Sequence, residues 1–145
     1  RHTRYGTVTG VQTCALPIFD EFQEVEDKRE RLEMLFELAD EVVELPQEDW
    51  TEATRVRGCQ SEAHVRVDMA NGLIQFLGAA DAKMVQGLMG ILTIALDGLT
   101  PAQAVLIPPQ FAEDMGLLNT LTPSRSNGFR NMYDKVMNEI RQYGV

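Results

Sequence analysis

The chain contains one stretch from which its organisation can be derived, residues 56–69, which read VRGCQSEAHVRVDM. The second half of this stretch alternates apolar and polar residues from Ala63 to Met69, a period of two that is typical of a half-buried strand. The first half places Gly58 directly before Cys59. Because glycine tolerates backbone conformations that other residues avoid, the pattern predicts a turn that presents a thiol on a loop at the mouth of a sheet.

Two interpretations of Cys59 follow from this context. Loops carried on a rigid scaffold are a common place for reactive groups, which favours a nucleophilic thiol. Free cysteines are also among the most buried residue types and often act as small hydrophobic side chains. The sequence around Cys59 leaves both interpretations open.

The residues after this stretch predict a hairpin. Asn71-Gly72 is a strong turn signal, and Leu73 to Leu77 reads as the returning strand, closed by Gly78. Arg55 to Arg57 is expected to add a third, short strand beside this pair. The sequence therefore predicts a small antiparallel three-stranded sheet.

Helical periodicity surrounds the predicted sheet. Apolar residues three and four positions apart predict three amphipathic helices, through Leu32, Leu35, Phe36, Ala39, Val42 and Val43, through Met84, Val85, Leu88, Ile91, Leu92, Ala95 and Leu96, and through Phe129, Met132, Tyr133, Val136, Met137 and Ile140. The first is expected to end before Pro46, because the residue before a proline avoids the α region. With 145 residues, the chain is predicted to be one α+β domain.

The boundaries of the second helix can be predicted from its flanking residues. Asp81 is a candidate N-cap or first-turn residue, and Gly98 is expected to end the helix in a left-handed conformation. Thr100-Pro101 is expected to open a further helix as its N-cap and first residue. Gly87 and Gly90 lower helix stability by about 1 kcal/mol each relative to alanine, and close packing against the sheet would explain them.

The first 18 residues differ from the rest of the chain. They show no sustained helical or alternating pattern, and Gly10 to Ile18 looks like the translation of a sequencing adapter. Pro17 interrupts an apolar run that is too short for a convincing signal peptide. We therefore expect residues 1–18 to be a non-native or disordered head and residues 19–145 to form the domain.

The net charge of −9 is concentrated in one region. Residues 20–50 hold thirteen acidic and three basic side chains, which form either a solvated helix face or a surface for a basic partner. Nucleic acid is not an expected partner, because binding phosphates requires lysine and arginine. No apolar run reaches 18 residues, so no membrane span is expected. Two cysteines without a disulfide framework favour a reducing, cytoplasmic location.

Four ordered blocks carry a family resemblance. They are Gly58-Cys59-Gln60-Ser61, then Phe76-Leu77-Gly78 with Asp81-Ala82 and Met84-Val85-Gln86-Gly87-Leu88, then Asp97-Gly98-Leu99-Thr100-Pro101, and last Leu121-Thr122-Pro123-Ser124-Arg125-Ser126-Asn127-Gly128. Together they resemble the SufE-type sulfur acceptors of iron–sulfur cluster assembly over roughly residues 20 to 143. The resemblance implies a SufE-like fold that is shared with the cluster scaffold protein.

The resemblance also implies a function. A protein of this type accepts persulfide sulfur from a cysteine desulfurase on the residue matching Cys59, stimulates that enzyme, and delivers the sulfur to an iron–sulfur scaffold complex. It acts as a persulfide carrier rather than as a stand-alone enzyme, and it needs no cofactor because the desulfurase carries the pyridoxal phosphate. The alternative is a non-catalytic module that binds a desulfurase and activates it allosterically. The family more often has glutamine and larger apolar or aromatic residues where this chain has Glu62-Ala63-His64, which bears on the choice of partner.

Three residues are candidates to act on Cys59. Positive charge near a thiol favours the thiolate, which is the nucleophile, so Arg57 and Arg125 are possible thiolate stabilisers. Each could instead be a solvated or ion-paired arginine. Asp81 matches a family position near the cysteine loop and could be its neighbour rather than a helix cap.

Other chemistries lack the necessary residues. His64 follows Cys59 by five positions, which suggests a Cys–His pair, but its place opposite the apolar strand face predicts a solvated histidine. A structural zinc ion takes four protein ligands, and iron–sulfur clusters are held by several cysteines. One credible cysteine, Cys59, and one credible histidine, His64, cannot supply either site.

Overall fold

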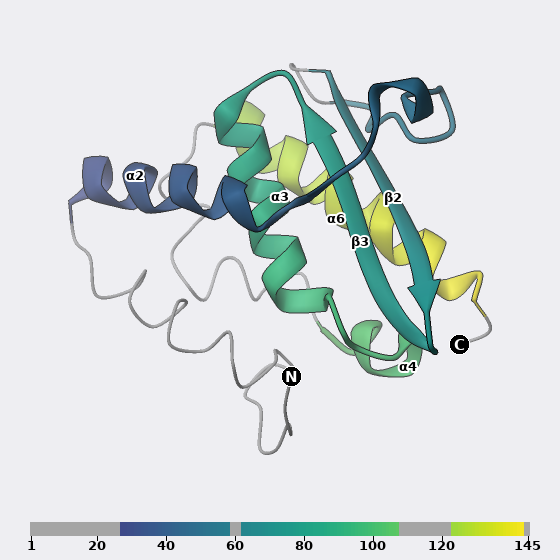
Figure 1. Ribbon diagram of the computed structural model, residues 1–145. Helices are drawn as coiled ribbons and strands as arrows, with labels where there is room; N and C mark the ends of the chain where they lie inside the picture. The colour runs from purple at the N-terminus through teal and green to yellow at the C-terminus, as the bar shows by residue number, and fades with distance from the viewer. Residues whose placement is uncertain (1–26, 59–61, 108–122, 144–145) are drawn as a thin grey trace.

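The structure, a computed structural model, describes residues 27–58, 62–107 and 123–143. Its elements follow in the order α2 (Lys28–Leu38), η3 (Ala39–Glu41), β1 (Val43–Glu44), η4 (Gln47–Asp49), β2 (Ala63–Ala70), β3 (Leu73–Ala80), α3 (Lys83–Leu96), α4 (Pro101–Ala104) and α6 (Pro123–Arg141). Helices pack on a three-stranded sheet, as Figure 1 shows. The expected α+β class is confirmed, whereas the predictions for residues 1–18 lie outside the described residues.

The hairpin forms where the sequence predicts it. β2 and β3 pair antiparallel, with Ala63 opposite Ala80 and Ala70 opposite Leu73. The turn has a positive φ at both central residues, 56° at Asn71 and 80° at Gly72, which is the requirement of a type I′ hairpin turn. β3 continues past Gly78, the expected end of the strand.

The prediction for the third strand is wrong. β1 lies on the other side of β3 from β2 and runs parallel to β3, with Val43 opposite Leu77. The sheet is therefore mixed, in the order β1-β3-β2, rather than wholly antiparallel. Arg55 forms only an isolated antiparallel bridge with His64 of β2.

The first helix is shorter than its apolar pattern suggests. α2 begins after Asp27, whose side chain accepts a hydrogen bond of 3.0 Å from the amide of Arg29. It ends at Leu38, where η3 turns the chain toward the sheet. Val43 falls on the apolar spacing of the predicted helix. In the structure it belongs to β1, where it pairs with Leu77 of β3.

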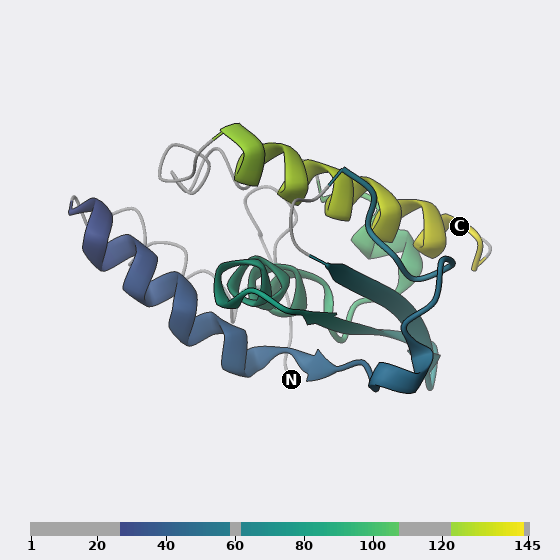
Figure 2. The same ribbon diagram turned by 90° about the horizontal axis from the view of Figure 1, so that it is seen from above.

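α3 is the central helix, and it lies between α2 and α6 (Figure 2). Its two interior glycines face α2 rather than the sheet. A β-carbon at Gly87 would lie 2.3 Å from the carbonyl oxygen of Leu35, and one at Gly90 would lie 2.0 Å from that of Leu38. The expected reason for these glycines, close packing, is confirmed, but the partner is a helix.

The connections after α3 follow the sequence signals. Gly98 has a φ of 84°, and its amide donates a 2.9 Å hydrogen bond to the carbonyl of Ile74. Thr100 caps α4 in a capping box with Gln103. The end of α3 is therefore fixed to the start of β3.

The two faces of the sheet are covered differently. One face packs on α3 and α6 and contributes to the main core with residues such as Val65 and Phe76, both fully buried. The opposite face carries a smaller apolar cluster of Leu45, Leu77 and Ala79, against which Trp50 packs. Among the described ranges, no helix combines the length and apolar character that crossing a membrane requires.

Candidate functional site

The candidate site is built on the two chain segments that flank Cys59. We define the cysteine segment as residues 57–62; within it Cys59, Gln60 and Ser61 lie outside the described residues. The amide of Val56 donates a 2.8 Å hydrogen bond to the carbonyl of Ala63, and the amide of Val65 donates one of 2.8 Å to the carbonyl of Thr54. The two ends of the cysteine segment are therefore held side by side at the start of β2.

Gly58 is required at its position for two reasons. Its φ of 80° lies in the left-handed region, which glycine adopts more readily than other residues. A β-carbon there would also lie 2.3 Å from Nδ2 of Asn131. The segment therefore approaches α6 closely one residue before Cys59, which confirms the turn predicted at Gly58.

Arg57 is an ion-paired surface residue. One of its guanidinium nitrogens lies 3.1 Å from a carboxylate oxygen of Glu52, and 80% of its side chain is exposed. An open groove runs beside it, with walls from Glu52, Arg55, Arg57, Asn131, Asp134, Lys135, Asn138, Glu139 and Gln142. Arg57 therefore begins the cysteine segment, and a carboxylate already accompanies the charge of its guanidinium.

Arg125 belongs to the helix that Gly58 contacts. Its backbone lies in the first turns of α6, six residues before Asn131, which is about 9 Å along a helix axis. Its side chain lies outside the described residues. The action of Arg125 on Cys59 therefore stays a prediction.

Asp81 lies beside the cysteine segment and does not cap α3. The N-cap of α3 is Ala82, which has no side-chain cap hydrogen bond. The amide of Asp81 instead donates a 3.2 Å hydrogen bond to the carbonyl of Glu62. The structure thus brings the backbone of Asp81 to the end of the cysteine segment, and the prediction of a cap is wrong.

His64 is buried, which overturns the prediction of a solvated strand histidine. Only 2% of the residue is exposed, and its ring stacks on the indole of Trp50 with the ring centroids 5.0 Å apart. Nδ1 lies 2.8 Å from Oγ1 of Thr54, and Nε2 lies 2.9 Å from a carboxylate oxygen of Glu62. The segment around η4 covers this face of β2, which strand periodicity alone cannot predict.

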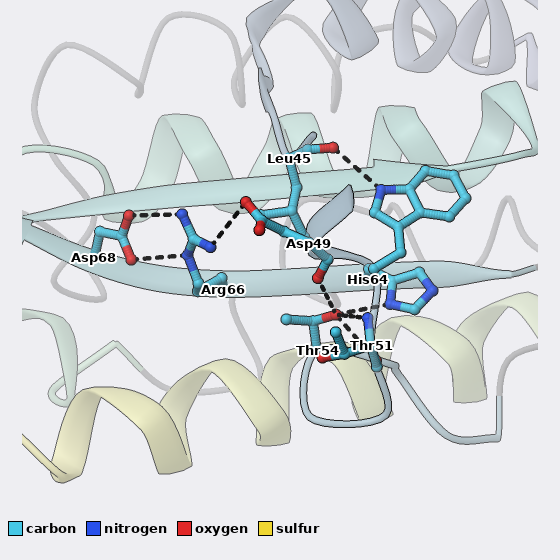
Figure 3. A network of polar contacts seen from close by, with 8 residues as sticks. Leu45, Asp49, Thr51, Thr54, His64, Arg66 and Asp68 are labelled. Carbon is cyan, nitrogen blue, oxygen red and sulfur yellow. Dashed lines mark hydrogen bonds and ion pairs between the residues drawn. The ribbon is translucent and has the colours of Figure 1, made fainter. Parts of the chain in front are cut away.

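The contacts of His64 are part of a larger polar network on the same face (Figure 3). Next along β2, Arg66 donates to both carboxylate oxygens of Asp68, at 3.0 and 3.1 Å, and to Asp49 at 3.3 Å. The hydrogen bonds with Asp68 raise the pKa of Arg66 above its usual value. The indole of Trp50 donates to the carbonyl of Leu45 at 3.1 Å. These contacts attach residues 45–54 to β2 along its outer face.

One residue of the sequence indicates this network, although the alternating pattern of β2 does not. Trp50 is the single tryptophan of the chain and lies in a polar segment shortly before the cysteine. Aromatic rings bury large areas and stack on other rings. On the outer face of β2, the ring of His64 is such a partner for Trp50. Among the described residues, no group of three histidine, cysteine, aspartate or glutamate side chains has the geometry of a metal site.

Comparisons with known proteins show the family and the fold of this chain. A family model described as "SufE: Fe-S metabolism associated domain" matches residues 17–140. An uncharacterized SufE-like protein of Synechocystis sp. is 36% identical over 116 residues, which cover 80% of this chain and 73% of that protein. An uncharacterized SufE-like protein of Rhizobium etli is 30% identical over 129 residues, covering 86% and 87%.

A solved structure shares the architecture. The solution structure of a hypothetical protein from Thermus thermophilus superposes with a TM-score of 0.73 at 26% sequence identity. The similarity covers 87% of this chain and 95% of the Thermus protein. The fold of this chain therefore matches a known structure over nearly the full length of the Thermus protein.

Proposed function

This chain belongs to the SufE family, and from that premise we propose that it accepts persulfide sulfur from a cysteine desulfurase on Cys59 and delivers it to an iron–sulfur cluster scaffold. The family is associated with Fe–S metabolism, and its match includes Cys59. The observation that carries the proposal is the attachment of the cysteine segment. Both of its ends are fixed by hydrogen bonds at the start of β2, and Gly58 rests against α6.

The proposed reaction is a thiol–persulfide exchange. The Cys59 thiolate attacks the terminal sulfur of the persulfide on the desulfurase cysteine. A new S–S bond forms on Cys59, the S–S bond on the desulfurase breaks, and the desulfurase cysteine leaves as a thiolate. One sulfur atom moves without net oxidation or reduction. A thiolate on the scaffold then receives the sulfur from Cys59 by the same exchange.

Two arginines are the proposed thiolate stabilisers in this exchange. The guanidinium of Arg57 is exposed two residues before Cys59, and positive charge near a thiol favours the thiolate. Arg125, on the helix that Gly58 contacts, is the second candidate for this role. We assign Asp81 a place beside the segment through its hydrogen bond to Glu62. The reaction uses no cofactor on this chain, since pyridoxal phosphate acts within the desulfurase.

The substitution Cys59→Ser tests the proposal against the allosteric alternative. Serine preserves the size of the side chain but removes the sulfur nucleophile. Binding to a desulfurase should persist, because one side chain is a small part of an interface of about 800 Å² per partner. Stimulation of cysteine turnover should fall to the level without acceptor. Calorimetry and alanine production measure the two quantities in parallel.

The chain provides a matched control in its other cysteine. Cys14→Ser removes a thiol from the head of the chain, outside the family match, and should leave binding and stimulation unchanged. Full stimulation by Cys59→Ser at saturating concentration would reject the carrier role and favour allosteric activation.

A further inference from the structure

We propose that His64 is a positioning residue for the cysteine segment, acting through Glu62 at the end of that segment. The inference rests on the proposed function, because it assigns His64 a part in sulfur transfer. It starts from the burial of His64, whose two ring nitrogens contact residues on either side of Cys59 in the chain.

Both nitrogens of the His64 imidazole have a hydrogen-bond partner. A glutamate carboxylate only accepts hydrogen bonds, so Nε2 of His64 must carry the hydrogen that it donates to Glu62. Nδ1 lies 2.8 Å from Oγ1 of Thr54, and this hydroxyl also lies within hydrogen-bond distance of the carbonyls of Asp49 and Thr51, at 3.2 and 3.1 Å. The hydroxyl oxygen in turn accepts from the amide of Thr51 at 3.0 Å. Each polar atom of the imidazole therefore has a partner.

These two hydrogen bonds connect the chain on both sides of Cys59. Thr54 lies five residues before the cysteine and Glu62 three residues after it. The His64 ring lies between them and stacks on Trp50, which fixes its plane. The ring therefore connects Thr54, which precedes the cysteine segment, to Glu62, which ends it.

Glu62 is held from two directions. Its carbonyl accepts from the amide of Asp81, and its side chain accepts from His64. The side chain of Glu62 is 46% exposed, whereas that of His64 is 3% exposed. A carboxylate that faces solvent at this position would be free to move without the bond to the buried ring. His64 thus holds the side chain of Glu62, the last residue of the cysteine segment, while Asp81 holds its backbone.

The effect on function follows from geometry. A nucleophile reacts efficiently when it is held in the attacking position, and a misplacement of about 1 Å can reduce a rate on the order of a hundredfold. Loosening one of several attachments should have a smaller effect, on the order of tenfold. A typical interface of about 800 Å² per partner is larger than this segment, so affinity for the desulfurase should change little.

Two substitutions break the same contact from opposite sides. His64→Phe retains the stacking on Trp50 but removes both hydrogen bonds, and Glu62→Ala removes the carboxylate at a half-exposed position that tolerates truncation. Each should slow single-turnover sulfur transfer to Cys59 by about tenfold. The double variant should be no slower than the single ones, because both remove one interaction. Glu62→Gln should behave like the wild type, since its amide oxygen still accepts from Nε2.

A second readout does not depend on sulfur transfer. Hydrogen exchange of the Asp81 and Val56 amides reports the two backbone bonds at the ends of the cysteine segment. Both amides should exchange faster in His64→Phe and Glu62→Ala, while the amide of Ile74, bonded to Leu99 at the far end of the hairpin, should not. Arg66→Met is the matched control. It breaks a neighbouring contact between β2 and residues 45–54 but leaves His64 intact, so it should change neither transfer nor these exchange rates.

The outcomes separate this inference from the proposed function. Sulfur transfer within twofold of wild type in both single variants, or losses that multiply in the double variant, would overturn the positioning role while Cys59 remains the acceptor. Should the wild type take up no sulfur on Cys59, the proposed function fails and amide exchange decides alone. Unchanged exchange at Asp81 and Val56 would then reject the attachment by His64.

Discussion

Gly90 of α3 lies so close to Leu38 of α2 that a β-carbon at the glycine would be 2.0 Å from the Leu38 carbonyl oxygen. This oxygen belongs to the backbone at the end of α2, where the chain turns through η3 toward β1. The approach of the two helices therefore fixes the direction in which the chain reaches the sheet.

Replacing Gly90 with alanine should destabilise the fold. Alanine gains about 1 kcal/mol in helix propensity, but overpacking a buried contact typically costs about 1–3 kcal/mol, and here the obstacle is backbone. We expect a lower free energy of unfolding in urea. Asn138→Ala, at an exposed position of α6, gives the propensity gain without overpacking and removes only an exposed hydrogen bond from Arg141. A Gly90→Ala protein at least as stable as wild type would contradict the packing described here.

Tyr133 should make the stability depend on alkaline pH. Its phenol donates a hydrogen bond to the carbonyl of Ile107, and burial raises the pKa of Tyr133. Because the folded-state pKa exceeds the unfolded value of about 10, the contribution is fully present below about pH 10 and is lost as the pH rises through the folded-state pKa.

Tyr133→Phe tests this contribution. Loss of the hydrogen bond should lower the free energy of unfolding by about 1 kcal/mol at pH 7. The variant should also lose less stability than the wild type between neutral and strongly alkaline pH, as measured by urea unfolding at several pH values. Equal slopes in the two proteins would remove Tyr133 from the alkaline transition.

The role assigned to Arg125 can be tested through the reactivity of the thiol. Positive charge lowers the pKa of a nearby thiol, so Arg125→Ala should move the pH profile of Cys59 alkylation upward. The measurement uses iodoacetamide and a protein in which Cys14 is replaced by serine. Arg130→Ala is a control on the same helix, since Arg130 pairs with Asp134 on an exposed surface. An unchanged profile would leave Arg125 with a structural role only.

The head of the chain should contribute little to stability. No apolar periodicity in residues 1–18 predicts a face that packs on the core, and chain ends that are not attached to the fold tolerate truncation. Deleting residues 1–18 should therefore leave the melting temperature nearly unchanged in calorimetry. A large decrease would show that this segment packs on the domain.

Local signals in the sequence predicted the elements that local chemistry determines. The alternation of β2, the turn at Asn71-Gly72 and the capping box at Thr100 are all present, because each depends on residues within a few positions of one another. The pairing of β1 with β3 joins residues more than 30 positions apart, such as Val43 and Leu77. No periodicity within one segment contains that information.

The site shows the same limit. The turn at Gly58 could be predicted because glycine and a nearby strand indicate it. The burial of His64 depends on Trp50, which folds over the outer face of β2 from a segment fourteen residues earlier. Alternation identified the face on which His64 lies but not what covers that face.

Intact-mass analysis of the protein after mixing with a cysteine desulfurase and cysteine tests the central claim most directly. With Cys14 replaced by serine, Cys59 should gain about 32 Da, the mass of one sulfur atom, and a thiol reductant should remove it. The additional Cys59→Ser substitution should abolish the gain. The absence of any adduct on Cys59, or an equal adduct after that substitution, would contradict the account of this chain as a persulfide carrier.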